Sequence, residues 1–467
     1  MVFSSTIFLF AFLPFVLLAV FPLRRAWQNA ALLGLSVVFY IWGAGGDVVF
    51  ILFVASISWG MAMVIPRLTG RARLIGQISA LAVVLSPLLW VKYVPVIQGW
   101  ADPDSVVLFA LPLGISFFTF HAVSYIVDVY RGDLKPEKRV DHYFLYLFLF
   151  PHQIAGPIVR YSEIRDEIKA RLRPRTEDVL YGLSRFGWGL AKKCVIADSA
   201  GRVADAVWAG ADQGDLSTAS AWIGAMAFTT QIYFDFSGYS DMAIGLARVF
   251  GFHFPENFAG PYRSPSATEF WRRWHMTLSR WFRDYVYIPL GGSRHGPLRE
   301  YIALLITFAL TSLWHGATFP FLIWGGLWST ALVIERVTGL RKARRAYVLR
   351  RVIMGVFIVF SWVAFRSATV DETTQIWTSM FTWVGGAPDP TVMLALTPIT
   401  LVGLALGLVM FLLPGRTAWR CFDRIAGDPA VTAGRPVVTA LVGLTALILG
   451  VMFAMWSSFS PFLYFQF

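Results

Sequence analysis

The run VVFILFVASISWGMAMV at Val48–Val64 contains no charged side chain and is typical of a helix inside a lipid bilayer. An α-helix rises 1.5 Å per residue, so about 20 apolar residues cross the roughly 30 Å hydrocarbon core. The chain holds twelve apolar runs of about 15 to 30 residues. They begin near residues 3, 29, 48, 75, 106, 179, 218, 302, 319, 352, 392 and 437. The sequence therefore predicts an all-α polytopic membrane protein with about twelve transmembrane helices.

The composition agrees with this interpretation over all 467 residues. Hydrophobic residues make up 57% and charged residues 15%, whereas soluble proteins average about 45–50% and roughly 25%. A water-soluble globule cannot bury so much apolar surface, which excludes a set of soluble domains. No internal repeat or linker divides the chain, so we expect one membrane domain over residues 1–467. Two cysteines, Cys194 and Cys421, are too few for a disulfide framework or a thiolate metal cluster.

The net charge of +12 is explained by membrane orientation. Of 40 Lys and Arg residues, 33 lie in the segments 24–25, 67–73, 131–142, 160–175, 248–300, 341–351 and 416–435. The segments 99–105, 201–217 and 369–390 hold one basic residue, Arg202, against eight acids. The positive-inside rule places the first set in the cytoplasm and the second outside, so both termini face out. The charge thus indicates a multi-pass cytoplasmic membrane protein and gives no reason to expect nucleic acid as a partner.

Two apolar segments need separate interpretation. Residues 3–22 resemble a secretory signal in length, but no charged segment precedes them and no small-residue cleavage site follows, so we interpret them as the first span. Residues 143–158 lie between two basic segments, contain Pro151 and Pro157, and are short for a crossing. They predict a re-entrant hairpin, which must be shielded by protein because lipid cannot satisfy irregular backbone.

Polar residues concentrate in the segment QIYFDFSGYSD at Gln231–Asp241, inside an apolar run. Ionisable groups at membrane depth are costly and are often functional. Asp235 and Asp241 therefore line a cavity, or they hold neighbouring helices together by pairing with Arg or Lys. Both alternatives remain open at this point.

The segment FWRRWHMTLSRWFRDYVYIPLGG, residues 270–292, predicts an amphipathic helix at the cytoplasmic interface. One face carries aromatic residues, with His275 at its border. The other carries four arginines: Arg272, Arg273, Arg280 and Arg283. These arginines bind either lipid headgroups or the phosphates of a nucleotide-containing donor. His275 is either a packing residue or a functional one.

His315 is the sharper candidate, because no Asp, Glu, Lys or Arg occurs from Tyr301 to Ile334. Desolvation keeps a histidine neutral there, and neutral imidazole can accept a proton from a hydroxyl. The alternative is a core histidine bonded to a helix carbonyl. His152, in the predicted hairpin, either packs or lines a pore. No metal-binding histidine spacing, Walker loop, nucleophile elbow or dinucleotide fingerprint occurs.

Five motifs together resemble the membrane-bound O-acyltransferase family, and the resemblance extends over essentially the whole chain. They are YFDFSGYSDM (233–242), NFAGPY (257–262), FWRRWHMTLS (270–279), YIPLGG (287–292) and LWHG (313–316). The chain ends MVFSS (1–5) and PFLYFQF (461–467), with FPHQIAGPI (150–158), resemble the bacterial branch that O-acetylates alginate. The signature region covers about residues 230–320.

The resemblance implies helices around a tunnel that carries an acyl group from the cytoplasm to the outside of the bacterial inner membrane. His315 matches the family's buried essential histidine and His275 its second histidine, while Asp235, Asp241 and His152 are expected along the tunnel. Acetyl-CoA is the expected donor, without metal or prosthetic group. An exported polysaccharide is the expected acceptor, reached through an extracytoplasmic acetyltransferase partner. D-alanyl or other acyl transfer and a non-covalent transporter or flippase are the alternatives.

The carboxyl terminus fits the pattern Phe-x-Tyr-x-x-Phe, with Tyr464 at its centre. It resembles a short terminal motif through which envelope-modifying members are thought to pass on an acyl group. The topology above delivers Tyr464 to the outer side, from where it is expected to fold back toward His315. The alternative is an aromatic anchor at the membrane interface.

Overall fold

The computed structural model describes residues 2–101, 111–170, 174–211, 216–340, 346–412, 436–456 and 462–463. All regular elements within these ranges are helices, and no strand occurs among them. The chain forms two compact units, Met1–Phe186 with Ser240–Pro255, and Gly187–Tyr239 with Glu256–Phe467. It passes between them three times, inside α9 (Thr176–Ala191), inside α11 (Thr218–Val249) and between Pro255 and Glu256. The assignment of one domain stays a prediction.

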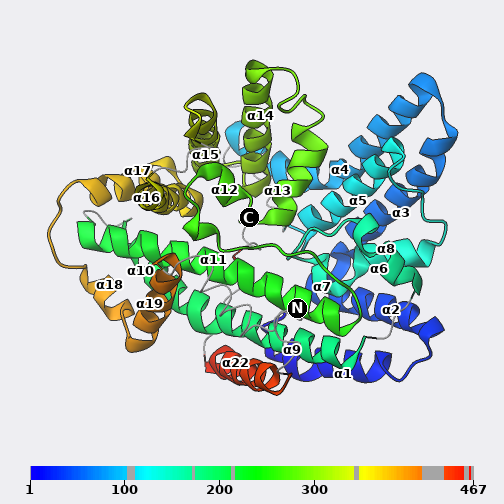
Figure 1. Ribbon diagram of the computed structural model, residues 1–467, viewed down its shortest axis with the longest axis horizontal. Coiled ribbons are helices and arrows are strands. Elements are labelled where there is room, and N and C mark those ends of the chain that lie inside the picture. Colours follow the sequence, from blue (N-terminus) through cyan, green and yellow to red (C-terminus); the bar gives the residue numbers. More distant parts are fainter. Residues whose placement is uncertain are drawn as a thin grey trace. The chain divides into compact units, whose positions relative to one another are not determined.

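The first unit contains most of the amino-terminal helices, drawn blue to cyan in Figure 1. They are η1 (Phe8–Phe12), α1 (Leu13–Val20), α2 (Arg25–Ala44), η2 (Gly45–Asp47), α3 (Val48–Val64), η3 (Ile65–Arg67), α4 (Gly70–Ala101), α5 (Ile115–Arg131), α6 (Val140–Phe148), α7 (Phe150–Gln153) and α8 (Tyr161–Ala170). Helix α3 packs against both α4 and α5, and α2 packs against α6.

The predicted hairpin lies in this unit and is interrupted as its prolines require. Helix α6 ends at Phe148 and α7 begins at Phe150, with Leu149 at φ −54°, ψ 109° between them. Residues 145–159 are buried without exception. The prediction that protein shields this irregular backbone is confirmed.

The second unit carries the remaining helices, drawn green to red. They are η5 (Lys192–Ala197), α10 (Asp198–Ala211), η6 (Pro261–Arg263), α12 (Ala267–Trp271), α13 (Met276–Phe282), η7 (Arg283–Tyr287), α14 (Pro297–His315), α15 (Phe319–Val337), α16 (Tyr347–Arg366), α17 (Val370–Phe381), α18 (Pro390–Ala395), α19 (Pro398–Leu412) and α22 (Pro436–Trp456). Helix α15 packs against both α14 and α16.

Helices α14 and α15 approach each other closely at Gly325. A Cβ atom at this position would lie 1.8 Å from the Ser312 hydroxyl oxygen. Glycine is therefore required for this spacing of the helices. Trp324, which precedes Gly325, is 1% exposed and faces the end of α14.

The sequence prediction of one continuous helix over residues 270–292 is wrong. Helix α12 ends at Trp271, α13 begins at Met276, and His275 between them has the left-handed conformation φ 41°, ψ 56°. The preceding loop explains the break. The backbone carbonyl of Asn257 accepts from the Met276 N–H at 2.8 Å, and the backbone carbonyl of Arg273 accepts from the Ala259 N–H at 2.9 Å. These bonds replace the helical bonds that a continuous helix would make.

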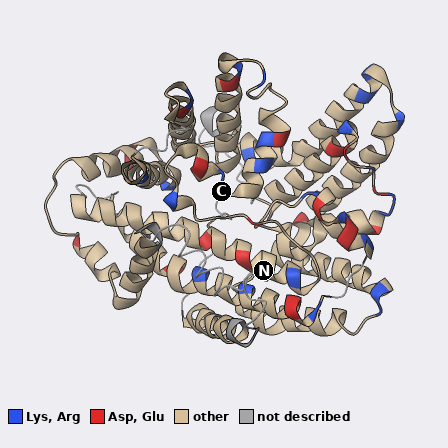
Figure 2. Ribbon diagram, viewed as in Figure 1, with Lys and Arg blue, Asp and Glu red and all other residues tan. Residues whose placement is uncertain are grey.

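Every predicted apolar run contains a helix in the structure. Three stretches, Arg25–Arg67, Gly70–Gln98 and Tyr347–Arg366, are long and apolar enough to cross a membrane. Shorter apolar helices cover Phe8–Val20, Pro398–Val409 and Ala440–Trp456. Long parts of the helices carry no charge, as Figure 2 shows. The chain is a helical membrane protein, and the number of twelve crossings stays a prediction.

Candidate active site

His315 is the last residue of α14 and is enclosed by aromatic side chains. It is 4% exposed. The centroid of its ring lies 4.6 Å from that of Trp314, 4.9 Å from Phe365, 5.3 Å from Trp324 and 6.3 Å from Phe321. These residues come from α14, α15 and α16, so the packing of three helices builds the enclosure.

Gly316 allows the enclosure to close. A Cβ atom at Gly316 would lie 2.3 Å from the Phe321 ring. The missing side chain at Gly316 leaves room for the Phe321 ring. Any larger residue would push this ring out of its stacked position over His315.

His275 is fully buried and is held by Asn257. The Asn257 Oδ1 atom accepts from the Thr277 N–H at 3.2 Å and the Thr277 hydroxyl at 2.9 Å, and it lies 3.1 Å from His275 Nδ1. Because a backbone N–H can only donate, this Asn257 atom is the carbonyl oxygen, and His275 Nδ1 carries the proton. His275 Nε2 is then the basic nitrogen. Burial lowers the pKa of His275 to about 3, so the ring is neutral near pH 7.

Trp314 lies between the two histidines. The centroid of its ring is 4.6 Å from His315 and 6.4 Å from His275. The two predicted histidines thus belong to one aromatic cluster of the second unit, with the Trp314 ring as their shared neighbour.

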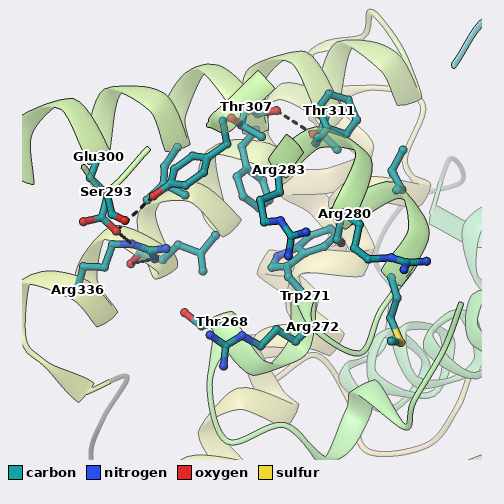
Figure 3. Close-up of a pocket in the computed structure, with 18 residues that line it drawn as sticks. Thr268, Trp271, Arg272, Arg280, Arg283, Ser293, Glu300, Thr307, Thr311 and Arg336 are labelled. Atoms are coloured by element: carbon teal, nitrogen blue, oxygen red, sulfur yellow. Dashed lines mark hydrogen bonds and ion pairs between the residues drawn. The ribbon is translucent and has the colours of Figure 1, made fainter. Parts of the chain in front are cut away.

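A cavity of about 500 Å³ opens beside this cluster. Its walls come from α12, α13, η7, α14 and α15, and Figure 3 shows its side chains. Arg272, Arg280 and Arg283 line it, as does Trp271. Arg273 is not among the lining residues and pairs with Glu269 on its own helical segment. Three of the four predicted arginines therefore share one cavity.

A fourth cation in the cavity was missed by the sequence analysis. Arg336, near the end of α15, also lines the wall, and its Nε atom lies 2.7 Å from Glu300 Oε1. Both residues flank the charge-free stretch of α14 and α15. Glu300 precedes one apolar run and Arg336 follows the next, which was a signal that the two side chains lie at the same depth in the membrane.

The inner wall of the cavity leads toward His315. Thr311 lines the cavity and precedes His315 by one turn of α14. The Trp271 ring, also in the wall, lies 5.9 Å from the Trp324 ring, which is one of the rings enclosing His315. Among the described residues, neither His315 nor His275 itself lines the cavity.

Glu335 fixes the short helix that carries Trp271 and Arg272. Its buried carboxylate accepts from the Ala267 N–H at 2.5 Å, the Thr268 N–H at 3.0 Å and the Thr268 hydroxyl at 2.8 Å. The two N–H groups are backbone donors at the amino end of α12, which lack partners within the helix. A five-residue helix alone is unstable, so the carboxylate from α15 holds it at the cavity.

Asp235 pairs within the second unit. Its Oδ1 atom lies 2.8 Å from Lys193 Nζ, and its Oδ2 atom accepts from the Leu463 N–H at 2.9 Å. Asp241 belongs to the first unit, where its Oδ1 atom lies 2.9 Å from Arg185 Nη2. Both carboxylates thus make the ion pairs that the sequence offered as one alternative. Their place along a tunnel stays a proposal.

The carboxyl-terminal tail enters the second unit at Phe462 and Leu463, which are 2% and 7% exposed. Phe462 stacks on Tyr239 with 4.7 Å between ring centroids. Tyr464 lies outside the described residues. Lys193 was missed as a partner, although a lysine within a predicted span was a signal for a nearby acid.

His152 is buried in the first unit, 4.6 Å from His121 and 4.9 Å from Phe254 between ring centroids. Its Nε2 atom lies 2.7 Å from the Tyr146 carbonyl. A pore-lining role for His152 stays a prediction. Within the described ranges, no three His, Cys, Asp or Glu side chains gather as a metal site.

Known proteins resemble this chain over its full length. Residues 140–369 match the model of the membrane-bound O-acyltransferase family. A probable alginate O-acetylase of Pseudomonas aeruginosa is 36% identical over 100% of both chains. A peptidoglycan O-acetyltransferase of Helicobacter pylori is 32% identical over 80% of this chain and 79% of its own. A teichoic acid D-alanyltransferase of Bacillus subtilis is 30% identical over 49% of this chain and 59% of its own.

Proposed function

The chain belongs to the membrane-bound O-acyltransferase family and is an O-acyltransferase, and on that premise we propose that it transfers acetyl groups from acetyl-CoA toward hydroxyls of an exported polysaccharide. The cavity lined by Arg272, Arg280 and Arg283 carries this proposal. Guanidinium groups bind phosphates with two parallel hydrogen bonds, and the donor carries phosphates at one end and its thioester at the other. The cavity wall leads from these arginines to the enclosure of His315.

The proposed chemistry needs one base. Neutral His315 takes the proton of the attacking hydroxyl as the oxygen attacks the thioester carbonyl. The new C–O bond forms, the C–S bond breaks, and the proton leaves with the sulfur as a free thiol. Enclosure by four rings limits the access of water to His315.

His275 and Tyr464 have supporting roles in this proposal. His275, between the phosphate-binding cavity and Trp314, orients the donor through its basic Nε2 atom. Tyr464 provides the first acceptor hydroxyl and carries the acetyl group onward. A phenol with a free pKa of about 10 is a poor nucleophile, so it needs a histidine base.

The relatives favour acetyl transfer to a polysaccharide. The full-length relative is named for O-acetylation of alginate, and the relative named for D-alanyl transfer matches only about half of this chain. An alginate-like polymer is therefore the proposed acceptor, and D-alanyl transfer is the second candidate. We assign completion of the transfer to a separate extracytoplasmic acetyltransferase. The charge distribution supports a bacterial inner-membrane protein with both termini outside.

The test uses purified protein with radiolabelled acetyl-CoA. His315→Ala and His315→Gln should each lower acetyl transfer by about 100- to 10,000-fold, the usual contribution of general base catalysis. Their melting temperatures should stay near that of the unmodified protein. His295→Gln, at an exposed loop position, is the control and should remain active. A fully active His315→Gln protein would refute the proposal, and loss of folded protein in parallel with activity would support the core-histidine alternative.

A further inference from the structure

We infer that Asp235 and Lys193 are positioning residues that anchor the carboxyl-terminal tail beside His275. The anchor is a contact between a buried carboxylate and the tail backbone. The effect of this contact on catalysis rests on the proposed function, in which Tyr464 is the acyl carrier. The contact itself is independent of that proposal.

Three buried ionisable groups make up the anchor. Lys193 Nζ lies 2.8 Å from Asp235 Oδ1 and 2.7 Å from Asp198 Oδ1. The side chains of Lys193, Asp235 and Asp198 are 5%, 1% and 9% exposed. Lys193 thus pairs with both carboxylates.

The burial of the Asp235 carboxylate explains why the tail binds. A buried carboxylate is strongly destabilising unless donors satisfy its oxygens. Lys193 satisfies Oδ1 of Asp235, and the Leu463 N–H donates to Oδ2 at 2.9 Å. Hydrogen bonds to an ionised acceptor are roughly twice as strong as neutral ones. The backbone of the tail thus completes the cluster, independently of which side chain stands at position 463.

Aromatic packing then directs the tail toward His275. The Phe462 ring stacks on Tyr239 at 28° and lies 5.7 Å from Phe236. The Phe236 ring lies 4.6 Å from the His275 ring at 90°. The Phe236 ring is thus a shared neighbour of the Phe462 and His275 rings. A terminal tail is ordinarily frayed, so the burial of Phe462 and Leu463 indicates a specific seat for these two residues.

The anchoring of Leu463 has a consequence for Tyr464, the proposed acyl carrier. Tyr464 follows Leu463 directly in the chain, so the anchored residue is the sequence neighbour of the proposed carrier. In the proposed reaction, the anchor raises the effective concentration of the hydroxyl at the site.

The experiment separates the anchor from the chemistry. In the full-length protein, Phe462 is replaced by photoreactive p-benzoylphenylalanine, and mass spectrometry locates the cross-link. We expect it on the α11 segment that holds Phe236 and Tyr239. Leu463→Pro removes the leucine side chain and the donor N–H and fixes φ at about −65°, and it should lower the yield of this cross-link by about 10-fold or more relative to Leu463→Ala. Leu463→Ala keeps the N–H and is the matched control.

Equal yields from Leu463→Pro and Leu463→Ala would overturn the inference. Asp235→Asn keeps an acceptor oxygen but loses the charge, so its cross-link yield should lie between the yields of Leu463→Pro and Leu463→Ala. In acetyl transfer, Leu463→Pro should lower kcat and leave the KM for acetyl-CoA unchanged, with a melting temperature near that of Leu463→Ala. Tyr464→Phe should keep the cross-link and lose transfer to the polymer. If Tyr464→Phe is fully active while the cross-link persists, the carrier role fails and the anchor stands.

Discussion

His275 owes its position to one amide side chain. Asn257 bonds the backbone and hydroxyl of Thr277 and lies against His275 Nδ1, all through one oxygen atom. The left-handed backbone of His275 is costly for a residue other than glycine. Asn257 therefore stabilises the bend and fixes the tautomer of the ring it presents.

This arrangement predicts a pH dependence for Asn257→Asp. The carboxylate keeps the acceptor oxygen but places a negative charge beside His275, which raises the pKa of the ring from about 3 toward neutrality. Below the raised pKa the ring is protonated and Nε2 is no longer basic. The ratio of variant to unmodified acetyl transfer rates should therefore fall as pH decreases from about 8 to about 6. A ratio that is constant over this range would contradict the role of a neutral His275.

Sequence reasoning identified both histidines but not the residue that holds one of them. His315 stands out because ionisable residues are absent around it, and His275 because of its motif. Asn257 opens the motif NFAGPY, but no local pattern announces the left-handed turn at His275 that it holds. Lys193 was missed because its partner lies 42 positions along the chain, at Asp235.

At the scale of elements, the break between α12 and α13 divides the predicted arginine face. Arg272 follows α12, Arg280 belongs to α13, and Arg283 begins η7, yet all three line one cavity. Arg273 lies in the break and pairs with Glu269. A continuous helix would have placed Arg273 together with the other three.

Because the break separates Arg273 from the other three arginines, we expect substitutions of these residues to differ in their effect on the KM for acetyl-CoA. Arg280→Glu should raise the KM for acetyl-CoA by about 10- to 100-fold, the effect of losing a hydrogen bond to a charged group, and change kcat less. Arg273→Glu, at the matched position outside the cavity, should leave this KM nearly unchanged. Steady-state kinetics on purified protein give both constants. If both variants only fail to integrate into the membrane, the arginines are lipid anchors.

The contact between α14 and α15 predicts opposite effects at two adjacent glycines. Gly325→Ala places a Cβ atom against Ser312, and overpacking of this kind costs about 1–3 kcal/mol. Gly326→Ala meets nothing within 4 Å and should be neutral or slightly stabilising, because alanine favours helices. Thermal unfolding in detergent compares the two. Equal melting temperatures would show that the helices are not closely packed in the membrane.

The sequence was most informative about the helices that coincide with long apolar runs. Each predicted apolar run contains a helix, because burial in lipid or protein requires the same internal hydrogen bonds. The break at His275 was unpredictable, since bonds from residues 257–259 compete with the local helix. Boundaries thus depend on long-range contacts that periodicity does not contain.

At the scale of the whole molecule, the charge distribution orders the reaction in space. The cavity arginines belong to the basic segment 248–300, which the positive-inside rule places in the cytoplasm. Donor and acceptor then reach the protein from opposite sides of the membrane. This orientation stays a prediction for the chain.

Sealed vesicles test the orientation directly. Inside-out vesicles should form acetylated product with external acetyl-CoA, and right-side-out vesicles should do so only after permeabilisation, because acetyl-CoA is charged and does not cross lipid. A cysteine-reactive reagent that does not cross membranes should label Ser4→Cys from outside. Activity of intact right-side-out vesicles with external donor would reverse the proposed topology.

The aromatic enclosure of His315 also bears on a side reaction, the hydrolysis of the thioester donor. Water is the most abundant oxygen nucleophile in the cell, and an accessible imidazole would activate it as readily as a sugar hydroxyl. The rings around His315 leave only 4% of the residue exposed, so bulk water has little contact with the proposed base. Hydrolysis of the thioester is suppressed for the same reason that transfer is possible. The enclosure therefore favours a transferase over a thioesterase, and in the absence of an acceptor the donor should persist intact.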